Sequence, residues 1–164
     1  MNLFTSFSMR PFLFAVLLVV LADQISKAVV VSNLQLHEVR PVLQGFFNIT
    51  YITNTGAAFG FMAGAGKWGH IFFQVISVVA LCGLLYLYRS SRCRSYPLVW
   101  GISLVFGGAL GNLIDRIRYR SVIDFLDFYA GPYHWPAFNI ADSAITAGGI
   151  LLAWHFFRIA NKQY

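Results

Sequence analysis

Four long runs of apolar residues alternate with shorter segments that hold most of the charged and polar residues. The runs cover residues 11–31, 68–88, 97–114 and 138–159. A helix that crosses a bilayer needs about 20 predominantly apolar residues, and in hydrocarbon it satisfies its own backbone hydrogen bonds, which a small open sheet does not. The pattern therefore predicts an all-α membrane protein with four transmembrane helices, forming a single integral membrane domain over residues 1–164.

The first run also resembles a cleavable signal peptide. Arg10 precedes it, and the sequence Val-Leu-Ala at 20–22 is an acceptable cleavage site. The run is nevertheless long enough to cross the membrane. We expect it to be retained as the first span.

The segment between the first two runs alternates in short patches. Residues 47–51 read Phe-Asn-Ile-Thr-Tyr, and the turn-like sequence Asn-Thr-Gly follows at 54–56. Alternation is typical of strands, and Asn and Gly are typical of turns. Residues 41–62 are therefore expected to form a short strand pair, a small extracytoplasmic β-element on the membrane surface. Residues 119–137 are expected to be a long, aromatic and acidic loop.

Composition excludes several classes of protein. Hydrophobic residues make up 58% of the chain and charged residues 11%, against roughly 45–50% apolar and 25% charged in soluble domains. The net charge of +6 comes from scattered short clusters, so nucleic-acid binding is not expected. Cys82 and Cys93 form no CxxC pair, and the four histidines lie on different segments. Neither a metal site nor a cofactor is predicted.

All acidic residues fall on one side of the predicted membrane. With four alternating spans, the end of the first, the start of the second, the end of the third and the start of the fourth lie at the same face. Every carboxylate side chain belongs to these parts of the chain: Asp23, Glu38, Asp115, Asp124, Asp127 and Asp142. This conclusion holds for either orientation of the protein.

The basic residues divide equally between the two faces, so their number does not decide the orientation. The acid-free face carries Arg10, Arg89, Arg92, Arg94, Arg158 and Lys162, and the other face carries Lys27, Arg40, Lys67, Arg116, Arg118 and Arg120. The first group lies in short tails and one tight loop beside the spans, which is where basic residues gather on the cytoplasmic side. Several residues of the second group instead lie next to acidic residues that can pair with them. We therefore place the acid-free face and both termini in the cytoplasm.

Asp142 lies just inside the fourth run, and the presence of an ionisable group within a membrane span requires an explanation. A charge at the centre of a span costs about 2.5–3.5 kcal/mol on insertion scales. A structural explanation is a shallow position at the helix N-terminus, where the helix dipole favours a negative charge by roughly 0.3–1 kcal/mol. Asp23 and Lys27 are four residues apart on one helix face, and we expect them to neutralise each other.

Small residues cluster in the third and fourth runs. They are Gly107, Gly108, Ala109, Gly111, Gly148 and Gly149. Such residues let membrane helices approach closely, and we expect close helix packing at both clusters. A nucleotide-binding loop is not expected, because the Lys-Ser/Thr ending and a preceding strand are missing.

Five polar motifs follow one another along the chain. They are Asp-Gln-Ile-Ser-Lys at 23–27, Asn-Thr-Gly-Ala-Ala-Phe at 54–59, Gly-Gly-Ala-Leu-Gly-Asn-Leu-Ile-Asp-Arg at 107–116, Val-Ile-Asp-Phe at 122–125 and Phe-Asn-Ile-Ala-Asp-Ser at 138–143. In this order and spacing, over about residues 12–157, they resemble lipoprotein signal peptidase, also called signal peptidase II, an intramembrane aspartyl peptidase family. Five ordered motifs are far more specific than any one of them.

The resemblance implies an aspartyl endopeptidase of the bacterial inner membrane. Such an enzyme removes the signal peptide from prolipoproteins, cutting before a cysteine that carries diacylglyceryl, with its active site near the extracytoplasmic face. Prolipoproteins and membrane lipid are the implied partners, and globomycin-type inhibitors are implied ligands. No cofactor is implied.

The family's functional residues can be carried over by position. The catalytic pair would be Asp124 and Asp142. Substrate-binding positions of the family are matched by Asn54, Gly56, Asn112, Arg116 and Asn139. Asp23, Lys27 and Asp115 are expected to be supporting residues, Asp115 as a partner of neighbouring arginine side chains. Asp127 matches no catalytic position and is expected to be solvated.

The residues themselves are compatible with this chemistry. Two adjacent carboxyls that share one proton supply both a base for water and an acid for the developing oxyanion. An alternative is a small transporter or proton-relay helical bundle that uses Asp23, Asp115 and Asp142. Its weakness is that acids confined to one face leave the opposite half of the membrane without polar groups. A structural or assembly subunit is a third possibility, but it gives no account of Asp124 and Asp142.

Overall fold

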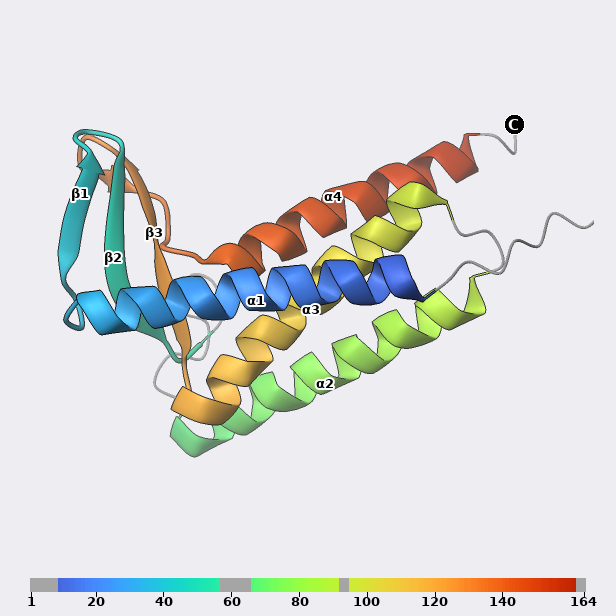
Figure 1. Ribbon diagram of the computed structural model, residues 1–164, viewed down its shortest axis with the longest axis horizontal. Coiled ribbons are helices and arrows are strands. Elements are labelled where there is room, and N and C mark those ends of the chain that lie inside the picture. The colour runs from blue at the N-terminus through green and yellow to red at the C-terminus, as the bar shows by residue number, and fades with distance from the viewer. Residues whose placement is uncertain (1–8, 57–65, 92–94, 162–164) are drawn as a thin grey trace, which may run out of the picture.

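The structure, a computed structural model, describes residues 9–56, 66–91 and 95–161. In this part of the chain four helices are long and apolar enough to cross a membrane. They are α1 (Arg10–Asn33), α2 (Gly66–Ser90), α3 (Tyr96–Tyr119) and α4 (Ile140–Ala160). The helices run along the length of the molecule, and a small sheet lies at one end (Figure 1). The predicted fold of four membrane-spanning helices with a small β-element is confirmed.

Capping groups, not the limits of the apolar runs, set the ends of α3 and α4. The Ser95 side chain accepts a hydrogen bond from the Leu98 N–H at the start of α3, and Arg120 ends this helix in the left-handed conformation with φ of 59°. Asn139 caps α4. As a result α3 continues past the predicted end at residue 114 and carries Asp115 and Arg116 within the helix.

The central helix is α3, which packs against each of the other three helices. At the end of the bundle away from the sheet, α1, α2 and α3 enclose an apolar cluster. It consists of Phe12, Val16, Tyr88, Leu98, Val99 and Ile102. The rings of Phe12 and Tyr88 lie with their centroids 4.5 Å apart. The apolar runs of the sequence thus form the packed core of this half of the molecule.

Close helix contacts occur at four of the predicted small residues, and a fifth lacks them. A Cβ atom would come within 3.0 Å of a neighbouring helix at Gly107, Gly108, Gly111 and Gly148. At Gly108 the atom in the way is the backbone oxygen of Ala141, so α3 and α4 touch backbone to backbone there. Gly149 has open space at its Cβ position, and the prediction of close packing is wrong for this residue.

Four strands form one antiparallel sheet in the order β1-β2-β3-β4. They are β1 (Val39–Leu43), β2 (Phe47–Asn54), β3 (Val122–Ala130) and β4 (Tyr133–His134). The predicted strand pair is present as β1 and β2, but its turn lies at residues 44–46 and not at 54–56, and residues 57–62 of the predicted element lie outside the described residues. The expectation that 119–137 is a loop is wrong, because β3 pairs with β2 and its first half is buried. Figure 1 shows β2 and β3 side by side.

The inner face of β2 is polar. Asn48 and Thr50 are buried, whereas Phe47, Ile49 and Tyr51 are only partly buried. The Thr50 hydroxyl donates to the Glu38 carbonyl over 3.0 Å. The alternation in the sequence therefore predicts the strand correctly, but polar side chains, not apolar ones, face the interior.

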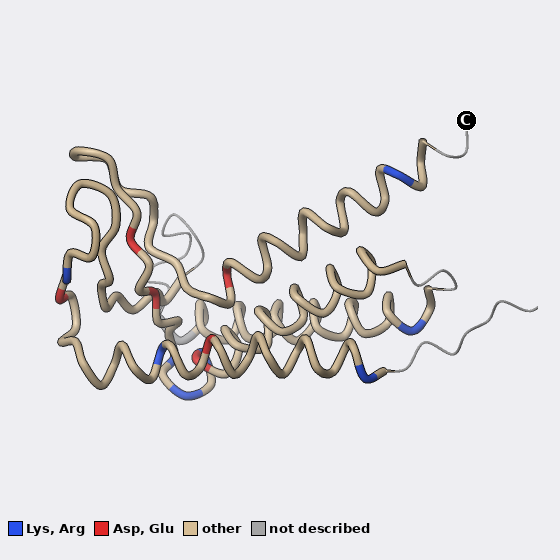
Figure 2. Tube along the Cα trace, turned by 45° about the horizontal axis from the view of Figure 1, so that its top comes forward, with Lys and Arg blue, Asp and Glu red and all other residues tan. Residues whose placement is uncertain are grey.

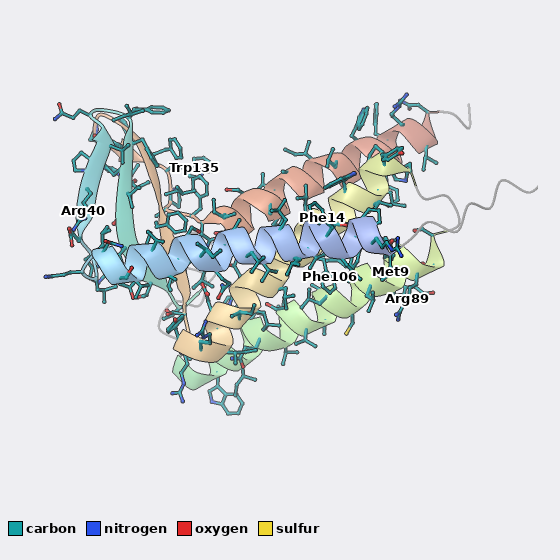
Figure 3. All side chains as sticks on the ribbon, in the orientation of Figure 1. Met9, Phe14, Arg40, Arg89, Phe106 and Trp135 are labelled. Carbon is teal, nitrogen blue, oxygen red and sulfur yellow. The ribbon has the colours of Figure 1, made fainter. Side chains whose placement is uncertain are left out.

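The charged residues are distributed unequally along the molecule. Figure 2 shows that the acidic positions lie in the half that carries the sheet, whereas the opposite end has only basic ones among the described residues. In Figure 3, Arg40 lies at the sheet, and Met9 and Arg89 lie at the other end of the bundle. This arrangement agrees with the shared face deduced for the carboxylates.

Candidate active site

A cavity of about 590 Å³ lies where the sheet meets α3 and α4. The predicted site residues Asn54, Gly56, Asn112, Arg116, Asp124 and Asp142 all line it. The remaining wall comes from Val122, Trp135, Pro136, Ala137, Phe138, Ser143, Ile145, Thr146, Ala147 and Ile150. Figure 3 shows Trp135 between the sheet and α4. One end of the cavity is thus polar, and the side along α4 is largely apolar.

Asp124 reaches the cavity from β3, where it pairs with Ile52 of β2. Its side chain is buried, and its Oδ2 and Oδ1 accept hydrogen bonds from Asn54 Nδ2 (3.2 Å) and Asn139 Nδ2 (2.8 Å). Burial, reinforced by the negative charge of Asp142, raises the pKa of Asp124 from 3.8 to about 7 in spite of these hydrogen bonds. Asp124 can therefore hold a proton near neutral pH.

Asp142 lies in the first turn of α4, where it forms a capping box with Asn139. The Asp142 backbone N–H donates to the Asn139 side chain (2.9 Å), and Asp142 Oδ2 accepts from the Asn139 backbone N–H (3.3 Å). Asn112 Nδ2 donates to Asp142 Oδ1 over 2.8 Å. The structural explanation for an acid at this position is therefore correct as far as it goes. The same carboxylate also lines the cavity, so Asp142 is placed for a functional role in addition to its structural one.

Asn139 links the two carboxylates although it does not line the cavity. Its side chain is fully buried, and Nδ2 donates to Asp124 Oδ1 while its backbone N–H donates to Asp142 Oδ2. The same Nδ2 is 3.3 Å from Asn112 Oδ1 and 3.2 Å from the Ile123 carbonyl oxygen. One residue thus fixes the position of both carboxylates relative to each other.

The supporting residues form a buried ionic cluster behind the cavity. Lys27 Nζ is 2.8 Å from Asp23 Oδ2 and 2.7 Å from Asp115 Oδ2. These three side chains are at most 2% exposed. A buried charge needs such partners, because an unpaired one would be strongly destabilising. The predicted pairing of Asp23 with Lys27 is confirmed.

The predicted partners of Asp115 are wrong. Its ion pair is with Lys27, and it also accepts hydrogen bonds from Gln24 Nε2 (2.9 Å) and the Ile123 backbone N–H (3.2 Å). Residues adjacent in a helix point in different directions, so Arg116 follows Asp115 in sequence but projects into the cavity wall.

Arg116 is held by α2 and by its own helix. Its guanidinium carbon lies 5.5 Å from the centre of the Phe73 ring, and Nη1 donates to the Asn112 carbonyl over 3.5 Å. Gln74 of α2 in turn donates to the Arg116 carbonyl over 3.1 Å. The cationic group is thus placed at the cavity by contacts that are not ion pairs.

The expectation that Asp127 is solvated is also wrong. Asp127 is buried, with Oδ2 accepting from Asn48 Nδ2 and Oδ1 next to His134 Nδ1, both at 2.8 Å. Asn48 and Asp127 are register partners in β2 and β3. Asp127 therefore ties the sheet together and does not contribute to the cavity lining.

Comparison with known proteins identifies the family of this chain. The family model for signal peptidase (SPase) II matches residues 15–158. The chain belongs to the signal peptidase II family. The lipoprotein signal peptidase of Desulforapulum autotrophicum is 47% identical over 146 residues, covering 88% of this chain and 89% of the relative. That of Syntrophus aciditrophicus is 51% identical over 142 residues, covering 86% and 88%.

Solved structures agree with the assignment of this signal peptidase II family member. A bacterial membrane enzyme determined by the in meso method at 2.3 Å resolution superposes with a TM-score of 0.86 at 33% identity, covering 95% of this chain and 93% of that chain. A second bacterial membrane enzyme, determined at 1.9 Å resolution, gives a TM-score of 0.80 at 34% identity, covering 90% and 93%. Family membership makes the chain a protease.

Several residues at or beside the cavity of this signal peptidase II family member have no role in the prediction from sequence. Gln24 lies inside the first motif and donates to both Asp23 and Asp115. The apolar cavity wall on α4 includes Ile145 and Ile150. Their helical spacing from Asp142 would have placed these residues on the same side of α4.

The described part of the chain contains no set of side chains arranged to bind a metal ion. No group of three or more His, Cys, Asp or Glu residues there could hold a metal ion. Cys82 is an exposed free thiol. Cys93 lies outside the described residues.

Proposed function

We propose that this chain is an aspartyl endopeptidase that removes the signal peptide from prolipoproteins. Membership of the signal peptidase II family supports the protease activity. The observation that carries the catalytic assignment is the position of Asp124 and Asp142 at one cavity, with Asn139 donating a hydrogen bond to each carboxylate. The relatives from Desulforapulum and Syntrophus are named lipoprotein signal peptidases, which supports prolipoproteins as the substrate.

The proposed reaction needs one proton shared by the two carboxyls. The ionised carboxyl takes a proton from water as the water oxygen attacks the carbonyl carbon of the scissile peptide bond, and the protonated carboxyl donates its proton to the carbonyl oxygen. In the second step the newly protonated carboxyl gives its proton to the amide nitrogen, the newly ionised carboxyl takes the proton of one hydroxyl of the tetrahedral intermediate, and the C–N bond breaks. The amine and the carboxylic acid are released, and the pair again shares one proton. The raised pKa of Asp124, about 7, supports its role as the proton donor.

The roles proposed for other cavity residues follow from the hydrogen bonds that they donate or from their charge. Asn54 and Asn112 each donate to one carboxylate and hold it in place. Arg116 carries a fixed positive charge at the cavity wall, where it would stabilise negative charge as it develops. The backbone N–H of Gly56 donates to Asn54 Oδ1 over 3.0 Å, which leaves the Asn54 amide nitrogen directed at Asp124. Gly56 therefore acts in the proposal by orienting Asn54.

The proposed substrate is a precursor whose cysteine carries diacylglyceryl. The apolar wall formed by Ile145, Ala147 and Ile150 on α4 suits an apolar signal segment or acyl chains beside the scissile bond. Globomycin-type inhibitors, implied by the family resemblance, would occupy the same cavity. The proposed location is the bacterial inner membrane, with both termini cytoplasmic and the cavity near the extracytoplasmic face.

A transporter or proton relay is not favoured. A path for ions needs polar groups along the whole membrane depth. In the described residues the carboxylates gather in the half with the sheet, and the other half of the bundle is packed with apolar side chains.

Cleavage by purified protein tests the proposed function. A synthetic diacylglyceryl peptide in detergent should be cut before its cysteine by the wild type, whereas Asp124→Asn and Asp142→Asn should each lose all measurable turnover while remaining folded. Asp127→Asn is the matched control: it alters a buried aspartate of the same strand and should keep most of its turnover. Substantial turnover in either catalytic variant would refute the dyad, and an inactive, folded Asp127→Asn would mean that the wrong aspartate of β3 was chosen.

A further inference from the structure

Lys27 does not line the cavity, yet it is hydrogen-bonded into the site. Its Nζ lies 2.7 Å from Asp115 Oδ2, 2.8 Å from Asp23 Oδ2 and 3.0 Å from Asn112 Oδ1. An ammonium group has three N–H donors and no acceptor. These three contacts therefore use every donor of Lys27, and each partner has to present an oxygen atom.

This contact fixes the orientation of the Asn112 carboxamide. Turning the amide over would bring its NH₂ group against the ammonium, donor against donor. With Oδ1 held by Lys27 and by Asn139 Nδ2 (3.3 Å), the Asn112 NH₂ points at Asp142 Oδ1 over 2.8 Å. The side of the amide that faces Asp142 is therefore always a donor.

We propose that Lys27 is a positioning residue of the active site: acting through Asn112, it holds Asp142 as the ionised carboxylate of the pair. The shared proton then resides on Asp124, so Asp142 activates the water and Asp124 protonates the carbonyl oxygen. An amide whose oxygen is bound to a cation is polarised and becomes a stronger N–H donor, and such donors favour a charged carboxylate. This inference rests on the proposed function.

Other charged groups near the pair act on both carboxylates across the site and not through one donor. Lys27 and Asp23 face it from α1, and Arg116 faces it from α3 with Asp115 beside it. Arg116 lines the cavity that both carboxylates line, and its positive charge interacts with both, more strongly with Asp142 than with Asp124. The donor that Lys27 orients, the Asn112 NH₂ group, instead contacts Asp142 and not Asp124.

A purely structural role for Lys27 makes a different prediction. In that case the ammonium only neutralises Asp23 and Asp115 in the interior. Removing one carboxylate together with the ammonium leaves the net charge of the cluster unchanged, so a role limited to this neutralisation predicts an enzyme about as active as Asp115→Asn. Under the positioning role, the same change would release the Asn112 amide and weaken Asp142 as the base.

The test compares Lys27→Met/Asp115→Asn with Asp115→Asn alone. Both variants lack one buried carboxylate, so they differ only in the ammonium. In the double variant Asp23 keeps its hydrogen bonds from Gln24 Nε2 and the Ala141 N–H, and the carboxamide oxygen introduced at position 115 can still accept from Gln24 Nε2. Melting temperature, kcat, KM and the pH profile are measured on the full chain in detergent with a diacylglyceryl peptide.

We expect the double variant to stay folded and its kcat to fall by about tenfold or more relative to Asp115→Asn, with KM within about twofold. The acid limb of its pH profile should move to higher pH, because loss of a nearby positive charge makes a carboxyl easier to protonate. Equal kcat and an equal pH profile in the two variants would overturn the positioning role.

A second variant keeps the test decisive if the double variant does not fold or Asp115→Asn is itself inactive. Lys27→Arg retains the charge, but a planar guanidinium cannot direct three N–H groups at three converging oxygens as an ammonium does. Folded Lys27→Arg should again lose about tenfold or more in kcat at similar KM, and wild-type kcat would overturn the inference. Failure of both Lys27 variants to fold would assign Lys27 to folding alone and would also overturn it.

Wild type and Asp142→Asn are assayed beside these variants. An inactive wild type, or an active Asp142→Asn, would refute the proposed function itself. Normal behaviour of these two proteins combined with full turnover in the Lys27 variants would refute only the positioning role.

Discussion

At the scale of single residues, the site is a hydrogen-bonded chain that runs from an ammonium to two carboxylates. Lys27 contacts Asn112, Asn112 donates to Asp142, and Asn139 connects Asp142 to Asp124. Buried polar groups are stable when each has a partner. An asparagine suits such a chain because its side chain accepts at one atom and donates at the other. Three of the predicted site residues are asparagines for this reason.

The pH dependence of cleavage should reflect the titration of the pair. One carboxyl must be protonated and the other ionised, so a bell-shaped profile is expected. Burial raises the pKa of Asp124 to about 7, so its proton is present below that pH and is lost above it. We expect kcat/KM to fall as pH rises through about 7, measured with the diacylglyceryl peptide in a series of buffers. A rate that keeps rising into alkaline pH would contradict this assignment.

The same titration has a defined effect on stability. The folded-state pKa of Asp124 lies above its ordinary value of 3.8, so the folded protein binds more protons than the unfolded chain between pH 3.8 and about 7. This group's contribution therefore becomes less favourable as pH rises through that window. Melting curves of wild type and Asp124→Asn across the window provide the control. An identical pH dependence in the two proteins would be inconsistent with the raised pKa.

Sequence reasoning at this scale identified the residues better than their partners. The alternation of four spans predicts Asp124 and Asp142 on one face, the motif resemblance pairs them, and the structure brings both to one cavity. The partners of Asp115 were assigned from sequence neighbours, whereas Lys27 reaches it from another helix. The prediction that Asp127 is solvated follows only from its matching no catalytic position, and its partner Asn48 is identified only by the register of two strands from distant parts of the chain.

At the scale of elements, the contact between α3 and α4 determines where Asp142 lies. Gly108 touches the backbone of Ala141, the residue before Asp142, and Asp23 of α1 accepts a hydrogen bond from the Ala141 N–H over 3.0 Å. The start of α4 is thereby held by two helices. The small-residue pattern predicted this packing at Gly108, although it could not show which helix would fill the space.

Gly108→Ala should destabilise the protein and reduce its activity. The added methyl group would press on the Ala141 carbonyl oxygen, which is backbone and cannot turn away. Such overpacking costs about 1–3 kcal/mol, and it would displace Asp142 from Asn112. Gly149→Ala is the matched control, since its Cβ would meet open space. Melting temperature and kcat should fall for the first variant only, and equal behaviour of the two would contradict the role given to this contact.

The sheet was the least predictable element. The strand pattern of 47–54 is visible in the sequence, but the residues of β3 combine aromatic, apolar and acidic types without a simple alternation. Its burial comes from pairing with β2, which lies on the other side of two helices in the sequence. Local patterns contain no information on such a pairing, so Asp124 could be assigned to the site only through the motif resemblance.

At the scale of the whole molecule, two ends of different character imply an orientation in the membrane. The sheet and the carboxylates are at one end, and basic residues alone are at the other among the described residues. Arg89 lies at that second end, next to the exposed Ser90 at the end of α2. Because basic residues beside membrane spans are typical of the cytoplasmic side, we propose that this end faces the cytoplasm.

Cysteine labelling tests this orientation. In a Cys82→Ala/Cys93→Ala background, a single cysteine replacing Ser90 should react with a membrane-impermeant thiol reagent only from the cytoplasm. One replacing Gln44, an exposed residue in the turn between β1 and β2, should react only from outside. Reversed labelling would overturn the orientation and leave the shared end of the carboxylates unaffected.

The lipid on the substrate is expected to act mainly by positioning the scissile bond. Burying an acyl chain from water is worth about 0.8 kcal/mol per CH₂, but the chains of a prolipoprotein are already in the bilayer, so moving them against Ile145 and Ile150 gains little net affinity. Chains held along α4 would instead keep the peptide bond at the depth of Asp124 and Asp142, and correct placement of reacting groups strongly affects rate.

Removing the diacylglyceryl group should therefore lower kcat/KM by well over tenfold, which is more than about 1.4 kcal/mol in transition-state stabilisation. Shortening each acyl chain by a few carbons should have only a small effect, because a shorter chain still fixes the depth of the cysteine. Both substrates are compared with the full diacylglyceryl peptide in lipid, where chain length does not change exposure to water. Cleavage of the unlipidated peptide at a comparable rate would show that the lipid does not position the bond, and would make the enzyme a general intramembrane peptidase.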